Sequence, residues 1–207
     1  MKIENIRPQD IEKRSFEIIG ETLGERDWDE LHKSIIYRAI HTSADFDYAD
    51  NLWFSENGAE RILDALRNGA HVVTDTNMAY SGINKKKLAA FGGEAHCFMA
   101  DEDVAKEAQE RGVTRAIVSM EKAAKLGVPT IFAIGNAPTA LIRIKELMDA
   151  GELSPAGIIG APVGFVNVIE SKERIMKADA PMIVARGRKG GSNIAAAIIN
   201  ALLYSKC

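Results

Sequence analysis

The stretch TIFAIGNAPTALIRIKELMDAGELSPAGIIGAP, residues 130–162, decides the fold class of this chain. A short apolar run leads into a helical segment that starts near Pro138, and a second apolar run follows a polar turn. Proline is favoured in the first turn of a helix, and Asn136 lies where a helix cap is expected. Two apolar strands joined by a helix form a parallel pair, because parallel strands need a long crossover connection. The stretch therefore predicts a strand–helix–strand unit.

The same alternation of short apolar runs and helical segments extends from residue 50 to the C-terminal helix. It predicts a single-domain α/β sandwich over residues 1–207, with a mostly parallel sheet and helices on both faces. The first third is expected to be helical. One helix runs along an apolar stripe and stops at Gly24, and a second opens with a capping box of Asp27 and Glu30. The order of the strands does not follow from these patterns.

Composition excludes several classes of protein. The chain has 207 residues, 46% of them hydrophobic, and a formal net charge of −3, so no broad basic field is present to bind nucleic acid. The polar N-terminus and the absence of a long apolar run predict a cytoplasmic protein with no membrane partner. Cys97 and Cys207 have no zinc-site spacing. Asp45, Asp47 and Asp50 lack the spacing of a calcium loop, so we expect a solvated loop there.

Ligands of open parallel sheets bind beyond the carboxyl ends of the strands. The segments that we expect there are rich in glycine, proline and small polar residues, and we expect each to be a loop. Together they predict a wide binding surface. The segments are TDTNMAYSGIN (74–84), IGNAPTAL (134–141), GAPVGFVN (160–167) and RGRKGGSN (186–193).

The last of these loops has the composition of an anion site. Backbone N–H groups of a glycine-rich turn before a helix attract anions, and Arg186, Arg188 and Lys189 add positive charge. The alternative is a tight turn whose basic residues are solvated. The spacing matches neither a Walker A loop nor the GxGxxG fingerprint. The helix start at Asn136 is either a second anion contact or simply a well-capped helix.

Arg38 and His41 share one face of the second helix, three residues apart. A cation on an apolar stripe needs a partner, and a histidine at a helix C-terminus is in a field that favours a cation. The pair is a candidate general acid beside an anion-binding arginine. The alternative for His41 is a histidine without a chemical role. We expect His32, His71 and His96 to be structural.

Ser15 lies inside the apolar stripe of the first helix, beside Arg14. Its hydroxyl either bonds back to a helix carbonyl or turns towards a ligand. The spacing of the residues favours neither interpretation.

Several segments together resemble one family, the precorrin-8X methylmutases, also called precorrin isomerases or cobalt-precorrin-8 methylmutases. The resemblance spans residues 11 to 203. It is carried by EKRSFEII, YRAIHTSADF, TDTNMAYSGIN, GVTRAIVSMEKA, AIGNAPTAL, GAPVGFVNVIESKE and ARGRKGGSN, in this order.

The resemblance implies an isomerase of cobalamin biosynthesis. It would move a methyl group from carbon 11 to carbon 12 of precorrin-8 or cobalt-precorrin-8, giving hydrogenobyrinate or cobyrinate. It also implies an α/β sandwich and a homodimer whose active site lies near the subunit interface. A methyl shift needs no external cofactor, and any cobalt would belong to the substrate. The sequence does not decide whether the ring arrives with cobalt, and we expect no metal ligands in the protein.

The catalytic histidine of the family matches His41, and its substrate-contacting serine and arginine match Ser15 and Arg38. The substrate is a large flat ring with many carboxylates, which arginines bind in bidentate fashion. We expect further carboxylate contacts from Arg188 and apolar ring contact from Tyr80. The other substrate-binding residues that we expect are Arg14, Thr42, Ser43, Thr76, Asn77, Met78, Arg115, Asn136, Ala137, Arg186, Gly191 and Ser192.

Two other functions remain to be distinguished. A tetrapyrrole carrier would use the same carboxylate contacts but give His41 no chemical role. A nucleotide- or sugar-phosphate-binding α/β enzyme would fit the fold class, although the Walker A and GxGxxG spacings are missing.

Overall fold

A computed structural model describes residues 4–206, which contain one six-stranded sheet with the order β1-β6-β5-β4-β2-β3. All neighbouring strands are parallel except β1 and β6, which are antiparallel. The predicted mostly parallel sheet is therefore confirmed. The strands are β1 (Leu52–Phe54), β2 (His71–Thr74), β3 (Ala95–His96), β4 (Thr130–Ile134), β5 (Gly157–Gly160) and β6 (Met182–Ala185).

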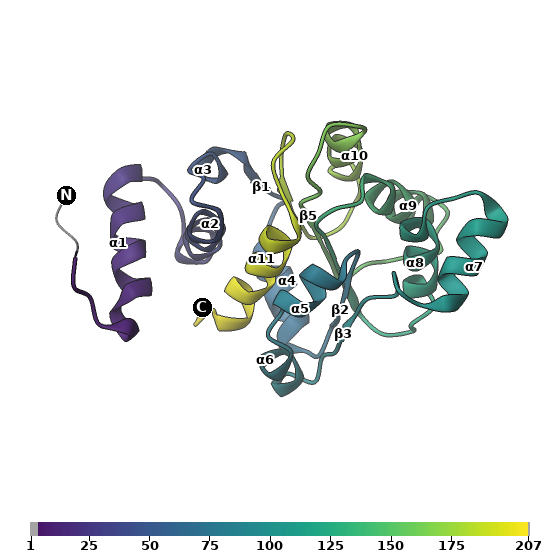
Figure 1. Cartoon of the computed structure of the whole chain (residues 1–207), viewed down its shortest axis with the longest axis horizontal. Helices are drawn as coiled ribbons and strands as arrows, with labels where there is room; N and C mark the ends of the chain where they lie inside the picture. The colour runs from purple at the N-terminus through teal and green to yellow at the C-terminus, as the bar shows by residue number, and fades with distance from the viewer. Residues whose placement is uncertain (1–3, 207) are drawn as a thin grey trace.

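Helices cover both faces of this sheet (Figure 1). One face packs against α2 (Glu30–Ser43), α4 (Gly58–Arg67) and α11 (Ser192–Tyr204). The other packs against α8 (Arg115–Ala124), α9 (Pro138–Asp149) and α10 (Val168–Ile175). The remaining helices are η1 (Pro8–Asp10), α1 (Ile11–Leu23), α3 (Tyr48–Asn51), α5 (Asn77–Gly82), α6 (Lys85–Ala90) and α7 (Glu102–Arg111).

Successive residues of β4 point into the two cores in turn, as the pleat of a strand requires. Ile131 and Ala133 pack with α2, α4 and α11, whereas Phe132 and Ile134 pack with α8, α9 and α10. A strand buried on both faces is apolar throughout, which is why TIFAIG shows no alternation.

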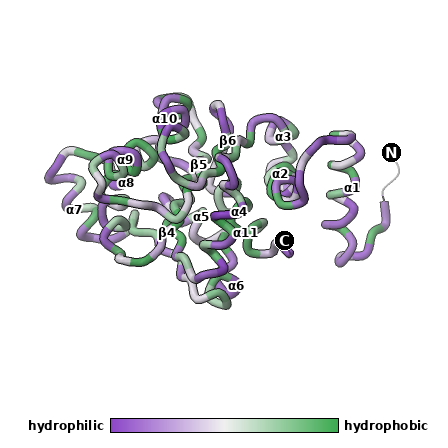
Figure 2. The backbone as a smooth tube through the Cα atoms, turned by 180° about the vertical axis from the view of Figure 1, so that it is seen from behind, coloured by the Kyte–Doolittle hydropathy of each residue, from purple (hydrophilic) through white to green (hydrophobic). Residues whose placement is uncertain are grey.

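The two outermost helices, α1 and α7, lie at opposite ends of the molecule (Figure 1). In Figure 2, α7 is mostly hydrophilic, whereas α1 shows hydrophilic and hydrophobic residues side by side. Ile19 is the only fully buried residue that α1 contributes, and Ile11 and Ile18 are exposed. The first helix therefore sits on α2 with much of its surface open. No helix among residues 4–206 is long and apolar enough to span a membrane.

Helix boundaries correct one prediction and confirm another. The capping box at Asp27 is wrong: α2 begins at Glu30, and Asp29 is its cap, accepting a 2.8 Å hydrogen bond from the backbone N–H of His32. Gly24 does end α1, with φ +67°, and its N–H bonds to the carbonyl of Gly20 at 3.0 Å. A positive φ of this size favours glycine.

The segment 74–84, expected to be a loop, contains the short helix α5. Thr76 starts this helix because its hydroxyl accepts the backbone N–H of Ala79 at 3.0 Å. The three other segments that were expected beyond the strands follow β4, β5 and β6 and meet at one edge of the sheet, as predicted. A side chain on Gly135 would lie 2.6 Å from the Cα of Ser192, so the loops after β4 and β6 touch.

Candidate active site

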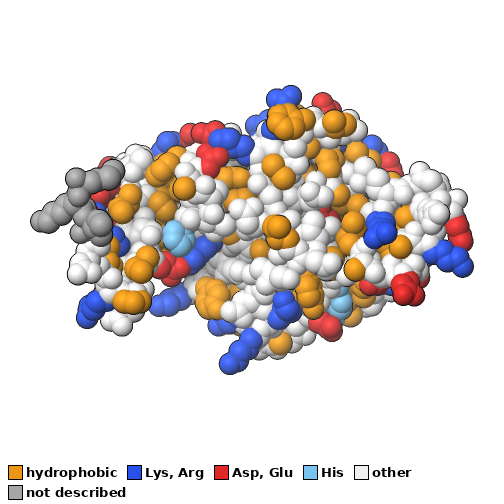
Figure 3. Space-filling view, viewed as in Figure 1, with side chains coloured by type: hydrophobic (Ala, Val, Ile, Leu, Met, Phe, Trp, Pro, Cys, Tyr) orange, Lys and Arg blue, Asp and Glu red, His pale blue; other side chains and the backbone are white. Residues whose placement is uncertain are grey.

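A groove of about 890 Å³ separates the N-terminal helices from α5 and α11. Figure 3 shows this face hollowed between the N-terminal helices and the rest of the molecule, with charged side chains at the hollow. Its volume is in the upper part of the range of about 300–1,000 Å³ that small-molecule sites occupy. The groove is lined by Glu12, Arg38, Thr42, Met78, Ser81, Gly82, Ile83, Asn84, Asn193, Ala196, Ala197, Asn200 and Tyr204.

Arg38 and His41 meet through one aromatic ring. The guanidinium carbon of Arg38 lies 5.1 Å from the ring centroid of Phe16, and the imidazole of His41 meets the same ring edge-on at 5.5 Å. Arg38 also forms an ion pair with Glu12 of α1. His41 is exposed on the last turn of α2, and its neighbour Thr42 lines the groove. Arg38 therefore lines the groove, oriented by its ion pair, whereas His41 is not among the lining residues and lies next to Arg38 through the ring of Phe16.

The stripe on α11 that lines this groove was missed in the sequence. Asn193, Ala197, Asn200 and Tyr204 recur with helical spacing along one face of a helix that is otherwise apolar and buried. The side chain of Asn200 bonds to the α5–α6 turn, accepting the N–H of Asn84 at 2.9 Å and donating to a carbonyl of α5. Polar residues at this spacing in SNIAAAIINALLY are the signal that would have identified the stripe.

The basic loop 186–193 carries less free charge than its composition suggests. Lys189 pairs with Asp45 and Asp47 at 2.7 and 2.5 Å, so the loop that we expected to be solvated also forms ion pairs. Hydrogen bonding to Lys189 also lowers the pKa of Asp45. Arg186 pairs with Glu173 at 3.0 Å. Within residues 4–206, Arg188 is the basic side chain of this loop that makes no ion pair.

The buried Lys172, which the sequence patterns did not single out, binds the loop 186–193 from its inner side. The Lys172 side chain is fully buried, and its Nζ donates to the carbonyls of Gly187 and Lys189, both at 2.8 Å. Burial lowers the pKa of Lys172 to about 8. The loop therefore turns two carbonyls inward, and its charged side chains face outward.

Asp75, directly after β2, lies at the start of α9, where the alternatives were a second anion contact or a helix capped by Asn136. The N-cap is Ala137, so the expectation that Asn136 caps this helix is wrong. The fully buried carboxylate of Asp75 accepts the backbone N–H groups of Gly135, Asn136 and Ala137 at 2.8, 2.8 and 2.6 Å. Burial raises the pKa of Asp75, and the three N–H donors offset only part of that rise. The backbone N–H groups of Asn136 and Ala137 are thus already paired, so an anion contact through them is ruled out in this structure.

The family model described as precorrin-8X methylmutase matches residues 10–205 of the chain. This chain belongs to the precorrin-8X methylmutase family. The cobalt-precorrin-8 methylmutase of Salmonella typhimurium is 48% identical, over 96% of this chain and 95% of the relative. The precorrin-8X methylmutase of Pseudomonas aeruginosa is 39% identical, with 82% of each chain covered.

A crystal structure of the precorrin-8X methylmutase from Thermus thermophilus superposes with a TM-score of 0.86 and 36% identity. The superposition covers 94% of this chain and 96% of that one. Fold and sequence therefore agree on the family, whose members are isomerases, that is, methyl-shifting mutases, of cobalamin biosynthesis.

In this methylmutase family member, Ser15 adopts one of the two arrangements that its spacing allows. Its hydroxyl donates to the carbonyl of Ile11 at 2.9 Å, the back-bonded arrangement. Arg14 is surrounded by carboxylates, and these raise its pKa. Its partners are Glu4, Glu17 and Glu21.

The other predicted substrate contacts fall into three groups. Thr42 and Met78 line the groove with Arg38, and Met78 is 70% exposed. Thr76 and Ser192 bond to each other through their hydroxyls at 2.7 Å, which links α5 to the start of α11. The third group consists of predicted contacts that do not line the groove, namely Ser43, Asn77, Tyr80, Arg115, Arg186, Arg188 and Gly191.

Proposed function

We propose that this chain moves a methyl group from carbon 11 to carbon 12 of cobalt-precorrin-8, giving cobyrinate. The family match supports the reaction class, and a relative with 48% identity carries the name cobalt-precorrin-8 methylmutase. The cobalt ion would arrive inside the substrate ring. The metal-free ring, with hydrogenobyrinate as product, is the alternative substrate that the test below distinguishes.

His41 is the proton donor and acceptor in this proposal. As an imidazolium it protonates the conjugated ring, which makes the ring electron-poor and lowers the barrier to migration. The bond from carbon 11 to the methyl group breaks as the bond to carbon 12 forms, and the proton then returns to His41. The observation that supports this assignment is that His41 shares the ring of Phe16 with Arg38, and that Arg38 and Thr42, the residue after His41, line the groove.

Arg38 holds the substrate in this arrangement. In the free protein its guanidinium pairs with Glu12, an exposed residue of α1 that also lines the groove. A substrate carboxylate replaces Glu12 and forms a bidentate pair with the same guanidinium. Met78 offers an exposed apolar surface for the face of the ring. Arg115 and Arg188 are exposed and remain as contacts for carboxylates at the periphery.

The decisive test compares His41→Ala with wild type in turnover of cobalt-precorrin-8 and of the metal-free ring, and in absorption titrations with both products. We expect His41→Ala to lose turnover and to keep product binding, because the imidazole acts in the chemical step. The control is His32→Gln, on the same helix, whose ring packs on Phe54 at 4.1 Å and does not line the groove.

The control should turn over like wild type. Full turnover by His41→Ala would exclude the proposed role of the imidazole. A wild-type protein that binds both products but converts neither substrate would instead be a carrier.

We also propose that the chain is a homodimer, through the apolar loop between β5 and α10. Val163, Phe165 and Val166 are exposed there, and the last two are 84% and 78% exposed. Figure 3 shows hydrophobic side chains on the surface near α10. Exposed apolar side chains grouped in one loop are typical of a surface that another protein covers.

A further inference from the structure

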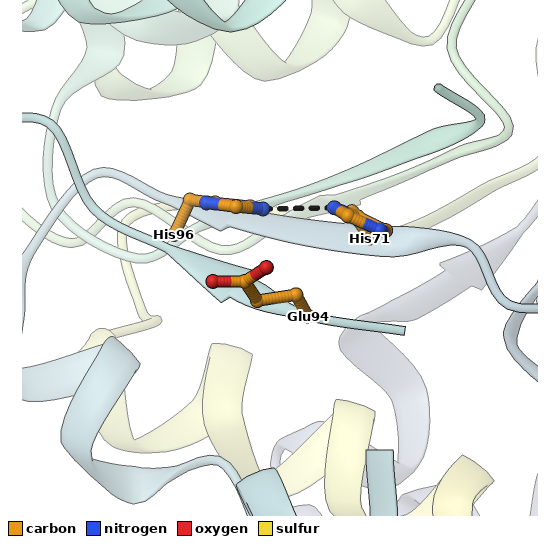
Figure 4. Close-up of side chains that lie close together, drawn as sticks. All are labelled: His71, Glu94 and His96. Atoms are coloured by element: carbon orange, nitrogen blue, oxygen red, sulfur yellow. Dashed lines mark hydrogen bonds between the residues drawn. The ribbon is translucent and has the colours of Figure 1, made fainter. Parts of the chain in front are cut away.

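Two histidines and a glutamate that are far apart in the sequence meet at the β2–β3 edge of the sheet. His71 starts β2, His96 ends β3, and Glu94 lies immediately before β3. Figure 4 shows the two imidazole rings pointing towards each other, with the Glu94 carboxylate beside His96. One ligand atom from each residue lies within 4.8 Å of the other two. The cluster is not part of the groove that we assign to the substrate.

The contacts inside this cluster leave one group unused. His71 Nδ1 and His96 Nε2 are 2.8 Å apart, which is a hydrogen bond between the two rings. The exposed carboxylate of Glu94 has no hydrogen bond or ion pair with any residue between 4 and 206. A histidine pair explains the two rings, and the carboxylate of Glu94 interacts with that pair only through its charge near His96.

We propose that His71, Glu94 and His96 hold one divalent transition-metal ion of the zinc class. Two imidazole nitrogens and one carboxylate oxygen are ligands that such ions prefer, and three protein ligands leave one position for water. This inference does not rest on the methylmutase assignment, because the site involves neither His41 nor Arg38.

The geometry requires the two rings to move apart and to turn, because their facing nitrogens now point at each other and not at a common ion. Two metal–nitrogen bonds of about 2.05 Å at a tetrahedral angle put the nitrogens about 3.4 Å apart. The present separation is 2.8 Å, so the rings must part by about 0.6 Å. His71 and His96 are partly exposed, which leaves room for this movement.

Metal binding to the two rings needs no added base to remove a proton. One facing nitrogen carries a proton in the histidine pair, and that proton moves to the outer nitrogen of the same ring when the metal binds. Both facing nitrogens then offer lone pairs to the ion, and Glu94 neutralises part of its charge.

The bound ion would add a link to the edge strand β3, which is paired with its neighbour over only two residues. Strand β3 has two residues and pairs with β2 at two positions, Ala95 with Val72 and His96 with Val73. A metal bridge between His71 and His96 adds a cross-link to that short ladder. An ion that binds the folded chain and not the unfolded chain raises the thermal stability of the protein.

The test is a calorimetric titration of tag-free protein with Zn²⁺, combined with thermal unfolding with and without the ion. We expect wild type to bind one equivalent and to unfold at a higher temperature when loaded. The double variant His71→Gln/His96→Gln should bind at least about a hundredfold more weakly, because it loses two of three ligands. Glu94→Gln, an exposed change that leaves both rings in place, should weaken binding by about tenfold.

His32→Gln is the matched control, because the group Asp29, His32 and Glu60 offers a second set of donor atoms with one imidazole. It should bind Zn²⁺ like wild type. Loss of binding in His32→Gln would place the ion at that other group and overturn the proposal. Weak binding that is the same in all variants would also overturn it, as would wild-type affinity in Glu94→Gln or in the double variant.

Discussion

The guanidinium of Arg38 lies over Phe16, with its central carbon 5.1 Å from the ring centroid. The same ring forms a T-shaped contact with His41, with the centroids 5.5 Å apart and an angle of 88° between the planes. Phe16 belongs to α1, whereas the two polar residues belong to α2. The packing of α1 on α2 therefore sets the relative positions of the proposed acid and its neighbouring arginine.

Phe16→Leu should lower kcat by about tenfold with a smaller change in KM, because misplaced reacting groups lose effective molarity. Phe16 is a positioning residue in this prediction, so the split between kcat and KM is the informative readout. Tyr37→Leu is the control. Tyr37 is another aromatic neighbour of Phe16, with ring centroids 6.0 Å apart, and it is neither the arginine nor the histidine that Phe16 positions. Equal losses of kcat in both variants would mean that general loosening of α1, and not orientation, is the cause.

Asp75→Asn should lower the free energy of unfolding by about 2–4 kcal/mol, because an amide offers one acceptor and two donors where three N–H groups converge. Urea unfolding followed by circular dichroism measures this change. Asp149→Asn is the matched control, since Asp149 is an exposed partner of Lys145, and such pairs contribute about 0–1 kcal/mol. A loss for Asp75→Asn no larger than that of the control would contradict the role of its three hydrogen bonds.

Lys172 should make the stability of the protein rise with pH above about 8. Its pKa is about 8 in the folded chain and 10.5 for a lysine in water, so between these values the unfolded chain holds more protons. The free energy of unfolding then increases with pH, by at most about 3 kcal/mol from this group. Comparing wild type with Lys172→Met between pH values of about 7.5 and 10.5 isolates the effect, because the other titrating groups are common to both. Parallel pH profiles would show that Lys172 stays protonated over this range.

Phe165→Ser should weaken the proposed dimer by about 30-fold, as truncation of a central aromatic contact does in other interfaces. Light scattering over a concentration series gives the dissociation constant. The control is Val128→Ser, which changes an exposed apolar residue outside the loop. A monomeric wild type, or a Phe165→Ser dimer as tight as wild type, would rule out this surface.

Local sequence patterns were sufficient to predict many of the strands and helices. The run TIFAIG, the helix at Pro138 and the run GIIGAP appear as β4, α9 and β5. The stop of α1 at Gly24 was also visible, because a glycine after an apolar stripe is a local signal. The misplaced cap shows the limit of such signals: Asp27 and Asp29 are equally good caps by type, but Asp29 is the one that has the extended backbone and accepts the N–H of His32.

The candidate site divides in the same way. Arg38 and His41 could be paired from the sequence, because residues three positions apart on a helix lie on the same face. Glu12, Phe16 and the polar stripe of α11 could not be added to them, since helix packing alone brings those segments to the groove.

The sequence by itself determined the alternation of strands and helices, the placing of segments 134–141, 160–167 and 186–193 at the carboxyl edge and, through its motifs, the family. These depend on periodicity and composition over a few residues, which a linear pattern records. Tertiary structure alone decided the strand order, the pairing of Lys189 with Asp45 and the burial of Asp75 under α9. It also brought His71 to His96. Charge and hydrogen-bond partners are chosen across space, because Coulomb and hydrogen-bond energies depend on distance between atoms and not on separation along the chain.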